Sequence, residues 1–145
     1  SLMVRQLAPI NAKWFVESGG YCMTAQKKSE LMAVLKHINA NDPRFASVSL
    51  SWIQCGDYGA NLLADVIKVS TTLVTLDLYH ADIGPVGATA LSAALLKNSS
   101  LSSLNLDGNN IGDAGAEQLL GALRGNTSLT ALSLANNHVA PAPAA

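Results

Sequence analysis

The chain is 145 residues long, with 49% hydrophobic and 13% charged residues and a formal net charge of −1. This length and composition predict a single folded domain with a substantial core and exclude a disordered chain. The near-neutral charge offers no basic field to a nucleic-acid backbone, and no apolar run reaches the roughly 18–20 residues that a membrane span needs. We therefore expect neither nucleic acid nor a membrane among the partners.

Two further features favour a cytoplasmic protein without a cofactor. The apolar stretch of residues 2–16 is interrupted by charged residues and proline, which disfavours a signal peptide. Cys22 and Cys55 have no CxxC spacing, which is typical of free thiols in a reducing compartment. Together with His37 and His80 they show no metal-ligand spacing, so we expect neither a metal nor another cofactor.

Residues 1–44 are predicted to form an N-terminal cap that covers the first strand of the fold. Aromatic residues on both sides of a Ser-Gly-Gly turn are compatible with a short hairpin within residues 1–23. A helix then follows, because apolar residues recur at helical spacing from Leu31 to Ile38. The chain leaves this helix near Pro43 and enters the repeated part.

A period of 28 residues governs the chain from Phe45 onward. Three columns of apolar residues repeat in step through four successive units, and a glycine-rich segment follows the third column. The aligned columns are Phe45, Leu73, Leu101 and Leu129; Val48, Leu76, Leu104 and Leu132; and Leu50, Leu78, Leu106 and Leu134. Such self-similarity indicates a stacked repeat architecture.

Each unit combines a strand and a helix. Along residues 103–107 polar and apolar side chains alternate, which predicts a short strand. In residues 116–123 the apolar residues recur at helical spacing, which places Leu119, Leu120 and Leu123 on one face. Stacked units would form a curved parallel sheet on the inside and a row of helices on the outside.

Two residues mark the starts of these helices. Asp113 is positioned as an N-cap that would accept hydrogen bonds from the open amides of the first turn. Pro85 takes the corresponding place in the preceding unit, where its fixed φ suits a helix start although it cannot cap.

The unit resembles the leucine-rich repeat, in the long subtype found in ribonuclease inhibitor, NOD-like receptors and Ran GTPase activators. The resemblance covers residues 45–139, as three full units and one partial unit, and implies an α/β solenoid: a right-handed βα horseshoe arc with a parallel inner sheet, outer helices and an N-terminal cap. Asn109 and Asn137 match the family's asparagine, which implies side-chain bonds to the loop backbone. Ile53 and Ala81 stand in that column earlier, so we expect those turns to be less regular or satisfied by water.

The C-terminal end departs from the repeat. Residues 140–145 form a Pro/Ala tail whose two prolines exclude a normal helix. The apolar residues of the last unit are therefore expected to be less well covered than their counterparts. They are Leu120, Leu123, Leu132 and Leu134. We expect this uncapped end to continue into a longer array, or to meet a partner or a second copy.

Members of the resembled family usually bind on the concave face of the sheet, so the outward side chains of the strands form the candidate site. Aromatic residues beside small polar ones suit recognition of a protein, because rigid aromatic side chains carry much of the binding energy. The alternative is a solvated sheet face with incidental aromatic residues. The predicted partner-binding residues are Ser49, Ser51, Trp52, Thr75, Asp77, Tyr79, His80, Asn105 and Asp107.

Catalysis and glycosylation are two other interpretations of the polar residues. Asp77, His80 and Asp107 could converge near serines, but no spacing enforces a Ser-His-Asp geometry and no nucleophile elbow or phosphate loop occurs. We therefore expect no enzymatic activity. The sequons at Asn98 and Asn126 share one column after the helix, where asparagine can end a helix and bond a turn, so a structural role is favoured.

Two functional classes follow. The first is a non-enzymatic protein-interaction module, either free-standing or part of a larger NOD-like sensor or regulator. The second rests on residues 40–53, ANDPRFASVSLSWI, which resemble the segment before the repeats of tropomodulin and leiomodin, where an Asn-Asp-Pro turn precedes a strand rich in Val and Leu. That resemblance implies binding to the pointed end of actin filaments. A structural spacer without its own ligand is the remaining alternative.

Overall fold

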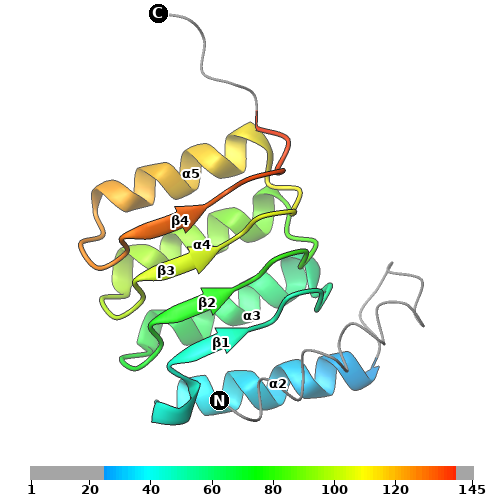
Figure 1. Cartoon of the computed structure of the whole chain (residues 1–145), viewed down its shortest axis with the longest axis vertical. Coiled ribbons are helices and arrows are strands. Elements are labelled where there is room, and N and C mark those ends of the chain that lie inside the picture. Colours follow the sequence, from blue (N-terminus) through cyan, green and yellow to red (C-terminus); the bar gives the residue numbers. More distant parts are fainter. Residues whose placement is uncertain (1–24, 140–145) are drawn as a thin grey trace, which may run out of the picture.

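A computed structural model of the chain describes residues 25–139 (Figure 1). The hairpin expected within residues 1–23 and the Pro/Ala tail of residues 140–145 lie outside the described residues. Within the described part, no helix is both long and apolar enough to cross a bilayer.

Helices and short strands alternate through the described chain, after one helix and a 3-10 turn. The elements are α2 (Ala25–Asn39), η1 (Pro43–Phe45), β1 (Ser47–Ser49), α3 (Gly56–Val69), β2 (Thr75–Asp77), α4 (Pro85–Lys97), β3 (Ser103–Asn105), α5 (Gly112–Arg124) and β4 (Ala131–Ser133). The predicted cap helix is therefore α2, which begins several residues before the apolar positions that indicated it.

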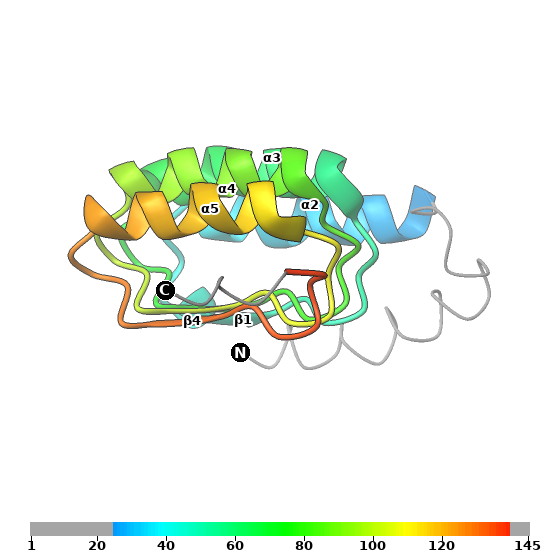
Figure 2. The same cartoon turned by 90° about the horizontal axis from the view of Figure 1, so that it is seen from above.

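The four strands form one parallel sheet in the order β1-β2-β3-β4. Val48 pairs with Leu76, Leu76 with Leu104, and Leu104 with Leu132. These are the residues that the 28-residue period aligned, so the predicted register is confirmed. Seen from above, the sheet forms one layer and the helices form the other (Figure 2). The predicted solenoid of strand-and-helix units, with a parallel sheet and a helix layer, is confirmed.

The core lies between these two layers. Leu76, Leu78 and Leu106 are fully buried, and Leu104 is 1% exposed. Burying a leucine side chain contributes about 1.5–3 kcal/mol relative to leaving it in water, so the repeated columns supply most of the driving force for folding. In the last unit Leu129, Leu132 and Leu134 are only partly buried, as expected for the end of the stack.

The helices pack closely because glycine and alanine lie where they meet. A Cβ added at Gly87 would lie 2.8 Å from the Cβ of Ala60 on the neighbouring helix. A Cβ at Gly115 would lie 3.1 Å from the Cβ of Ala88 in the same way. The small residues of each unit therefore set the distance between adjacent helices.

One helix start agrees with the sequence prediction and the other does not. Pro85 is the first residue of α4, as predicted. The prediction that Asp113 is an N-cap was wrong, because α5 begins at Gly112 with Ile111 as its N-cap, and Asp113 lies inside the first turn. The equivalent residue of α3, Asp57, caps the next helix instead: its Oδ1 accepts the backbone N–H of Gly84 at 2.8 Å and that of Gly87 at 2.9 Å. A residue of one unit thus caps the helix of the next unit.

We expect Leu104→Ala to lower the free energy of unfolding by about 2–5 kcal/mol, because it leaves a cavity between the sheet and the helices. Leu76→Ala, at the same register in the preceding strand, should behave alike. Urea unfolding followed by circular dichroism measures the change. Ser103→Ala, on the outer side of the same strand, is the control and should alter stability by less than about 0.5 kcal/mol. An unshifted transition for Leu104→Ala would contradict the assignment of the core.

Candidate functional site

The candidate site lies on the sheet face that points away from the helices. All nine predicted partner-binding residues are partly exposed, while the side chains between them in β1, β2 and β3 are buried. Thr75, Asp77 and Asn105 lie in the strands themselves, and Tyr79, His80 and Asp107 lie in the loops that follow. The alternation of the short strands therefore presents the predicted residues together on one face.

Three aromatic side chains form a compact cluster at the edge of this face. The ring of His80 stacks on that of Trp52, with centroids 4.1 Å apart and planes 6° apart. Tyr79 meets both rings edge-on, 5.6 Å from Trp52 and 4.5 Å from His80. Aromatic pairs at such distances and angles are worth about 0.5–1.5 kcal/mol beyond the area that they bury. The cluster is therefore a pre-formed apolar feature on a polar surface.

The backbone under this cluster is unusual for aromatic residues. Trp52 has φ of 65° and His80 has φ of 50°, values in the left-handed region. The next two residues of the same column are Gly108 and Asn136, which adopt this region more readily. Placing a bulky residue there costs on the order of 1 kcal/mol or more. Two large side chains thus hold positions where glycine or asparagine would be less strained.

The absence of a side chain at Gly108 leaves room for the ring of His80. A Cβ there would lie 2.7 Å from Cδ2 of His80, closer than side-chain carbons normally approach. The imidazole of His80 therefore lies between the indole of Trp52 and the bare backbone of Gly108, so one row of contacts spans three units.

The carboxylates of the site are held in place by neighbouring units. Oδ2 of Asp77 accepts the hydroxyls of Ser51 at 3.0 Å and Ser49 at 3.3 Å, and Oδ1 accepts the backbone N–H of Tyr79 at 3.0 Å. Both carboxylate oxygens of Asp77 are therefore fixed.

Asp107 is fixed differently, by the unit that follows it, because it stands 28 residues after Tyr79, whereas Asn105 is the equivalent of Asp77. Its Oδ1 accepts the backbone N–H of Ala135 at 2.8 Å and the hydroxyl of Ser133. Its own backbone N–H donates to Oδ1 of Asn105 at 2.9 Å. The two aspartates present oriented negative charge beside the aromatic cluster.

The described contacts do not assemble the Ser-His-Asp relay considered from the sequence. Ser49 and Ser51 donate to Asp77, while the ring of His80 stacks on Trp52. Among residues 25–139 no group of three or more His, Cys, Asp and Glu is placed to hold a metal ion. Burial raises the pKa of the Cys55 thiol to about 12, so this cysteine is protonated at neutral pH.

The asparagine column predicted from the resemblance is present. Nδ2 of Asn109 donates to the carbonyls of Leu78 and Leu106, both at 2.9 Å, and its Oδ1 accepts the N–H groups of Ala81 and Ile83 at 3.0 Å. Asn137 likewise donates to the carbonyl of Leu106. The site loops are therefore supported from below by buried side-chain amides.

The two earlier turns have no asparagine in this column, although Asn109 of the next unit bonds the N–H groups of Ala81 and Ile83 in the second of them. Ile53 and Ala81 fill the column with fully buried apolar side chains. The Gln54 side chain instead donates to the carbonyl of His80 at 2.9 Å. Gln54 and Asp82 adopt positive φ, but so does His138 beside Asn137, so this backbone conformation does not distinguish the two turns. The aromatic cluster is carried by these two turns.

A second polar column lies at the opposite edge of the sheet. Nδ2 of Asn98 donates to the carbonyl of Ile67 at 2.8 Å, and its Oδ1 accepts the N–H of Leu101 at 2.7 Å. Asn126 bonds Leu95 and Leu129 in the same way, so the structural interpretation of both sequons is confirmed.

Sequence reasoning missed the earlier members of this column, Ser70 and Asp42. The hydroxyl of Ser70 accepts the N–H of Leu73 at 3.1 Å. Asp42 accepts hydrogen bonds from the side chain and backbone of Arg44, which lower the pKa of its carboxyl well below the usual range. The 28-residue period alone could have identified them, although the residue types differ.

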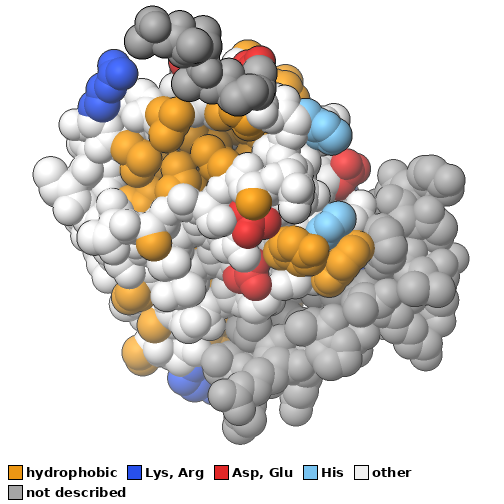
Figure 3. Space-filling view, turned by 45° about the horizontal axis from the view of Figure 1, so that its top comes forward, with side chains coloured by type: hydrophobic (Ala, Val, Ile, Leu, Met, Phe, Trp, Pro, Cys, Tyr) orange, Lys and Arg blue, Asp and Glu red, His pale blue; other side chains and the backbone are white. Residues whose placement is uncertain are grey.

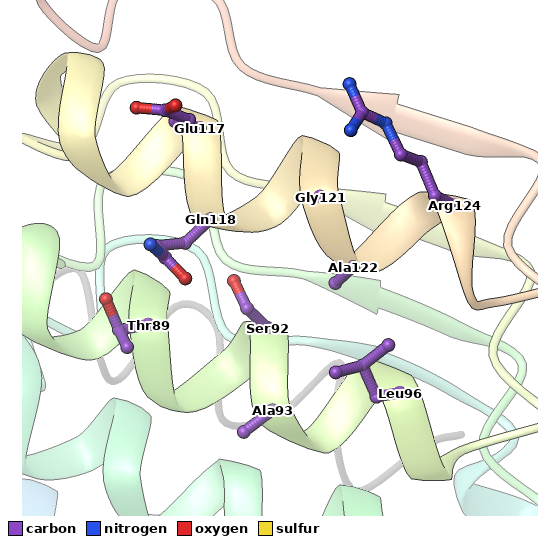
Figure 4. Close-up of a pocket in the computed structure, with 9 residues that line it drawn as sticks. All are labelled: Thr89, Ser92, Ala93, Leu96, Glu117, Gln118, Gly121, Ala122 and Arg124. Atoms are coloured by element: carbon purple, nitrogen blue, oxygen red, sulfur yellow. The ribbon is translucent and has the colours of Figure 1, made fainter.

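A shallow groove lies on the opposite, helical side of the molecule, between α4 and α5 (Figure 4). Its volume is about 440 Å³, and small residues such as Ser92, Ala93 and Ala122 line it. Gln118 points from α5 toward α4, whereas Glu117 and Arg124 point away from α4 (Figure 4). None of the predicted partner-binding residues belongs to this groove.

Comparison with known proteins agrees with the fold. The model of a family described as "Leucine Rich repeat" matches residues 69–92, 97–120 and 125–142. A solved structure described as "Leiomodin-1 Actin-Binding Site 2 (ABS2)" is similar with a TM-score of 0.69 and 25% identity, over 72% of this chain and 61% of that chain. The tropomodulin C-terminal domain of Caenorhabditis elegans is similar with a TM-score of 0.67 and 16% identity, over 74% of this chain and 65% of that chain. No curated protein matches the sequence.

The identity and the coverage of the two solved structures decide how far each similarity can be interpreted. At 16% identity the tropomodulin domain shows the fold alone. This chain spans 61% and 65% of the lengths of the two solved structures. The family match covers the second, third and fourth units.

We expect Asn109→Ala to lower the free energy of unfolding by about 2–4 kcal/mol, because it leaves buried carbonyl and N–H groups of two units without partners. Asn110→Ala changes the adjacent exposed side chain and serves as the matched control. Thermal melting of the two variants measures the difference. Equal melting temperatures would show that the column does not support the loops.

Proposed function

Because this chain is built of leucine-rich repeats, we propose that it is a protein-interaction module whose concave sheet face binds a protein partner. One observation carries the proposal: Trp52, Tyr79 and His80 form a pre-organised cluster beside two oriented carboxylates. Fixed side chains lose little conformational entropy on binding, so such a surface binds more favourably than a mobile one.

The chemistry of the cluster favours a cationic segment of the partner. On the outward positions of β1–β4 and in the loops that follow, the ionised side chains are Asp77, Asp82 and Asp107, with no lysine or arginine among them. An arginine guanidinium pairs with carboxylates and stacks on aromatic rings. We propose that the face recognises an exposed arginine-containing segment, with the aromatic rings as anchors and the aspartates as charge partners.

We expect a displayed random-peptide library, selected on this protein at physiological salt, to enrich arginine-containing peptides. Two double variants test the site: Trp52→Ala with Tyr79→Ala, and Asp77→Asn with Asp107→Asn. Each should bind the enriched peptides at least about tenfold more weakly than the wild-type protein does, because aromatic anchors and charge pairs each contribute more than 1 kcal/mol at such sites.

Gln118→Ala, on the helical side, is the matched control and should bind normally. Circular dichroism melts should show that the concave-face variants remain folded, since the altered side chains are partly exposed. Peptides that bind both double variants unchanged would remove this face from consideration, whatever their composition.

Actin binding is a second candidate, favoured by a specific similarity. The leiomodin-1 structure, which is described as an actin-binding site, shares 25% identity with this chain. The Asn-Asp-Pro turn that suggested this family has a defined structure here. Asp42 caps η1, and Oδ1 of Asn41 accepts the N–H of Thr71 at 2.9 Å. These contacts hold the turn against the first full repeat.

If this candidate is correct, the chain should slow pointed-end growth of gelsolin-capped filaments in a pyrene-actin assay. The effect should rise with concentration, and a heat-unfolded sample is the control. Unchanged elongation with folded protein would dismiss actin and leave the peptide-binding proposal intact.

A further inference from the structure

The end of the stack formed by α5 and β4 exposes apolar side chains that earlier units bury. Leu120 is 53% exposed, as expected for the apolar residues of the last unit. Leu132 and Leu134 are partly buried, whereas Leu104 and Leu106 are at most 1% exposed. Figure 3 shows hydrophobic side chains gathered at this end of the molecule. The surface is therefore apolar where the preceding units meet a neighbour.

This end is not shaped like the junctions inside the stack. At the position of Leu120, α3 has Ala64 and α4 has Ser92, both small and buried. Ser92 lines the groove that faces α5, so this position points toward the next helix. A helix packed on α5 as closely as α4 packs on α3 would collide with Leu120. The occupant of this end must therefore pack differently from another identical unit.

The charges on α5 are arranged for an antiparallel copy of the same helix. Glu117 and Arg124 are seven residues apart, about two turns, and flank Leu120 and Gly121. Both point away from α4 (Figure 4), and neither forms an ion pair with another described residue. A second α5 that runs antiparallel across the midpoint of Leu120 and Gly121 would bring each Glu117 opposite an Arg124.

β4, the strand at this end of the stack, could also pair with its counterpart in a second, antiparallel copy. The N–H of Ala131 donates toward β3, to the carbonyl of Ser102 at 3.1 Å. Because backbone groups alternate along a strand, the N–H and C=O of Leu132 point away from β3, to the side on which no other described strand lies. Two such edges that run antiparallel would exchange both hydrogen bonds at Leu132 and continue the sheet. Helix and strand thus favour one two-fold arrangement.

We propose that two copies of this chain associate through the α5–β4 end about a two-fold axis. α5 of one copy packs antiparallel on α5 of the other, with Leu120 at the centre and Glu117 opposite Arg124 of the second copy on both sides. β4 pairs antiparallel with β4 of the second copy through Leu132. The association is isologous, so it closes at a dimer.

Sedimentation equilibrium of the full chain tests this with two charge reversals. Glu117→Arg and Arg124→Glu should each weaken the dimer about tenfold or more, because two attractive contacts per dimer become repulsive. An equimolar mixture of the two variants should regain the wild-type affinity, since every contact is then between opposite charges. Lys68→Glu, at the equivalent position of α3, is the control and should leave the dimer unchanged.

The remaining outcomes are equally decisive. A wild-type chain that stays monomeric up to millimolar concentration would overturn the proposal. So would concentration-dependent filaments, which would indicate head-to-tail stacking, or a mixture that fails to re-associate although both variants melt like wild type. Leu120→Gln should weaken the dimer, and its melting temperature should equal that of wild type at a concentration at which wild type is monomeric, because this side chain is already exposed in the monomer.

Discussion

Each repeat of this protein can bury its apolar side only against the next repeat. The three-residue strands are too short to be stable alone, and their inward leucines are covered by the helix layer and by the leucines of adjacent strands. The fold therefore requires that every strand pair with the next in the same register. This register places Val48, Leu76, Leu104 and Leu132 side by side, and without it no unit would have a core. The site loops inherit their positions from that alignment.

Much of this was accessible from sequence, because the period reports the register directly. The strands, the helix layer and the exposed face of Asp77 and Asn105 follow from 28-residue spacing and alternation, whereas the role of Asn109 and Asn137 was implied by the resemblance to leucine-rich repeats. The features that the sequence did not predict depend on contacts between units. The reach of Asp57 to α4 is invisible within a single repeat.

The candidate site was likewise predicted only in part from the sequence. Alternation placed Trp52 and His80 near one edge, but not the stacking of their rings, nor the positive φ that both adopt. The bare backbone of Gly108 makes room for that stack, so a residue of the third unit shapes a feature carried by the first two. Recognition by this face is thus a property of neighbouring repeats rather than of any one of them.

The asparagine side chains link each repeat to the one before it. Asn98, Asn109, Asn126 and Asn137 each donate to a backbone carbonyl of the preceding unit: Ile67, Leu78, Leu95 and Leu106. Each repeat is completed by the one that follows it in the chain. During synthesis on the ribosome, these carbonyls of a newly emerged repeat would remain bonded to water until its successor leaves the exit tunnel, so we expect folding of the array to proceed one repeat behind translation.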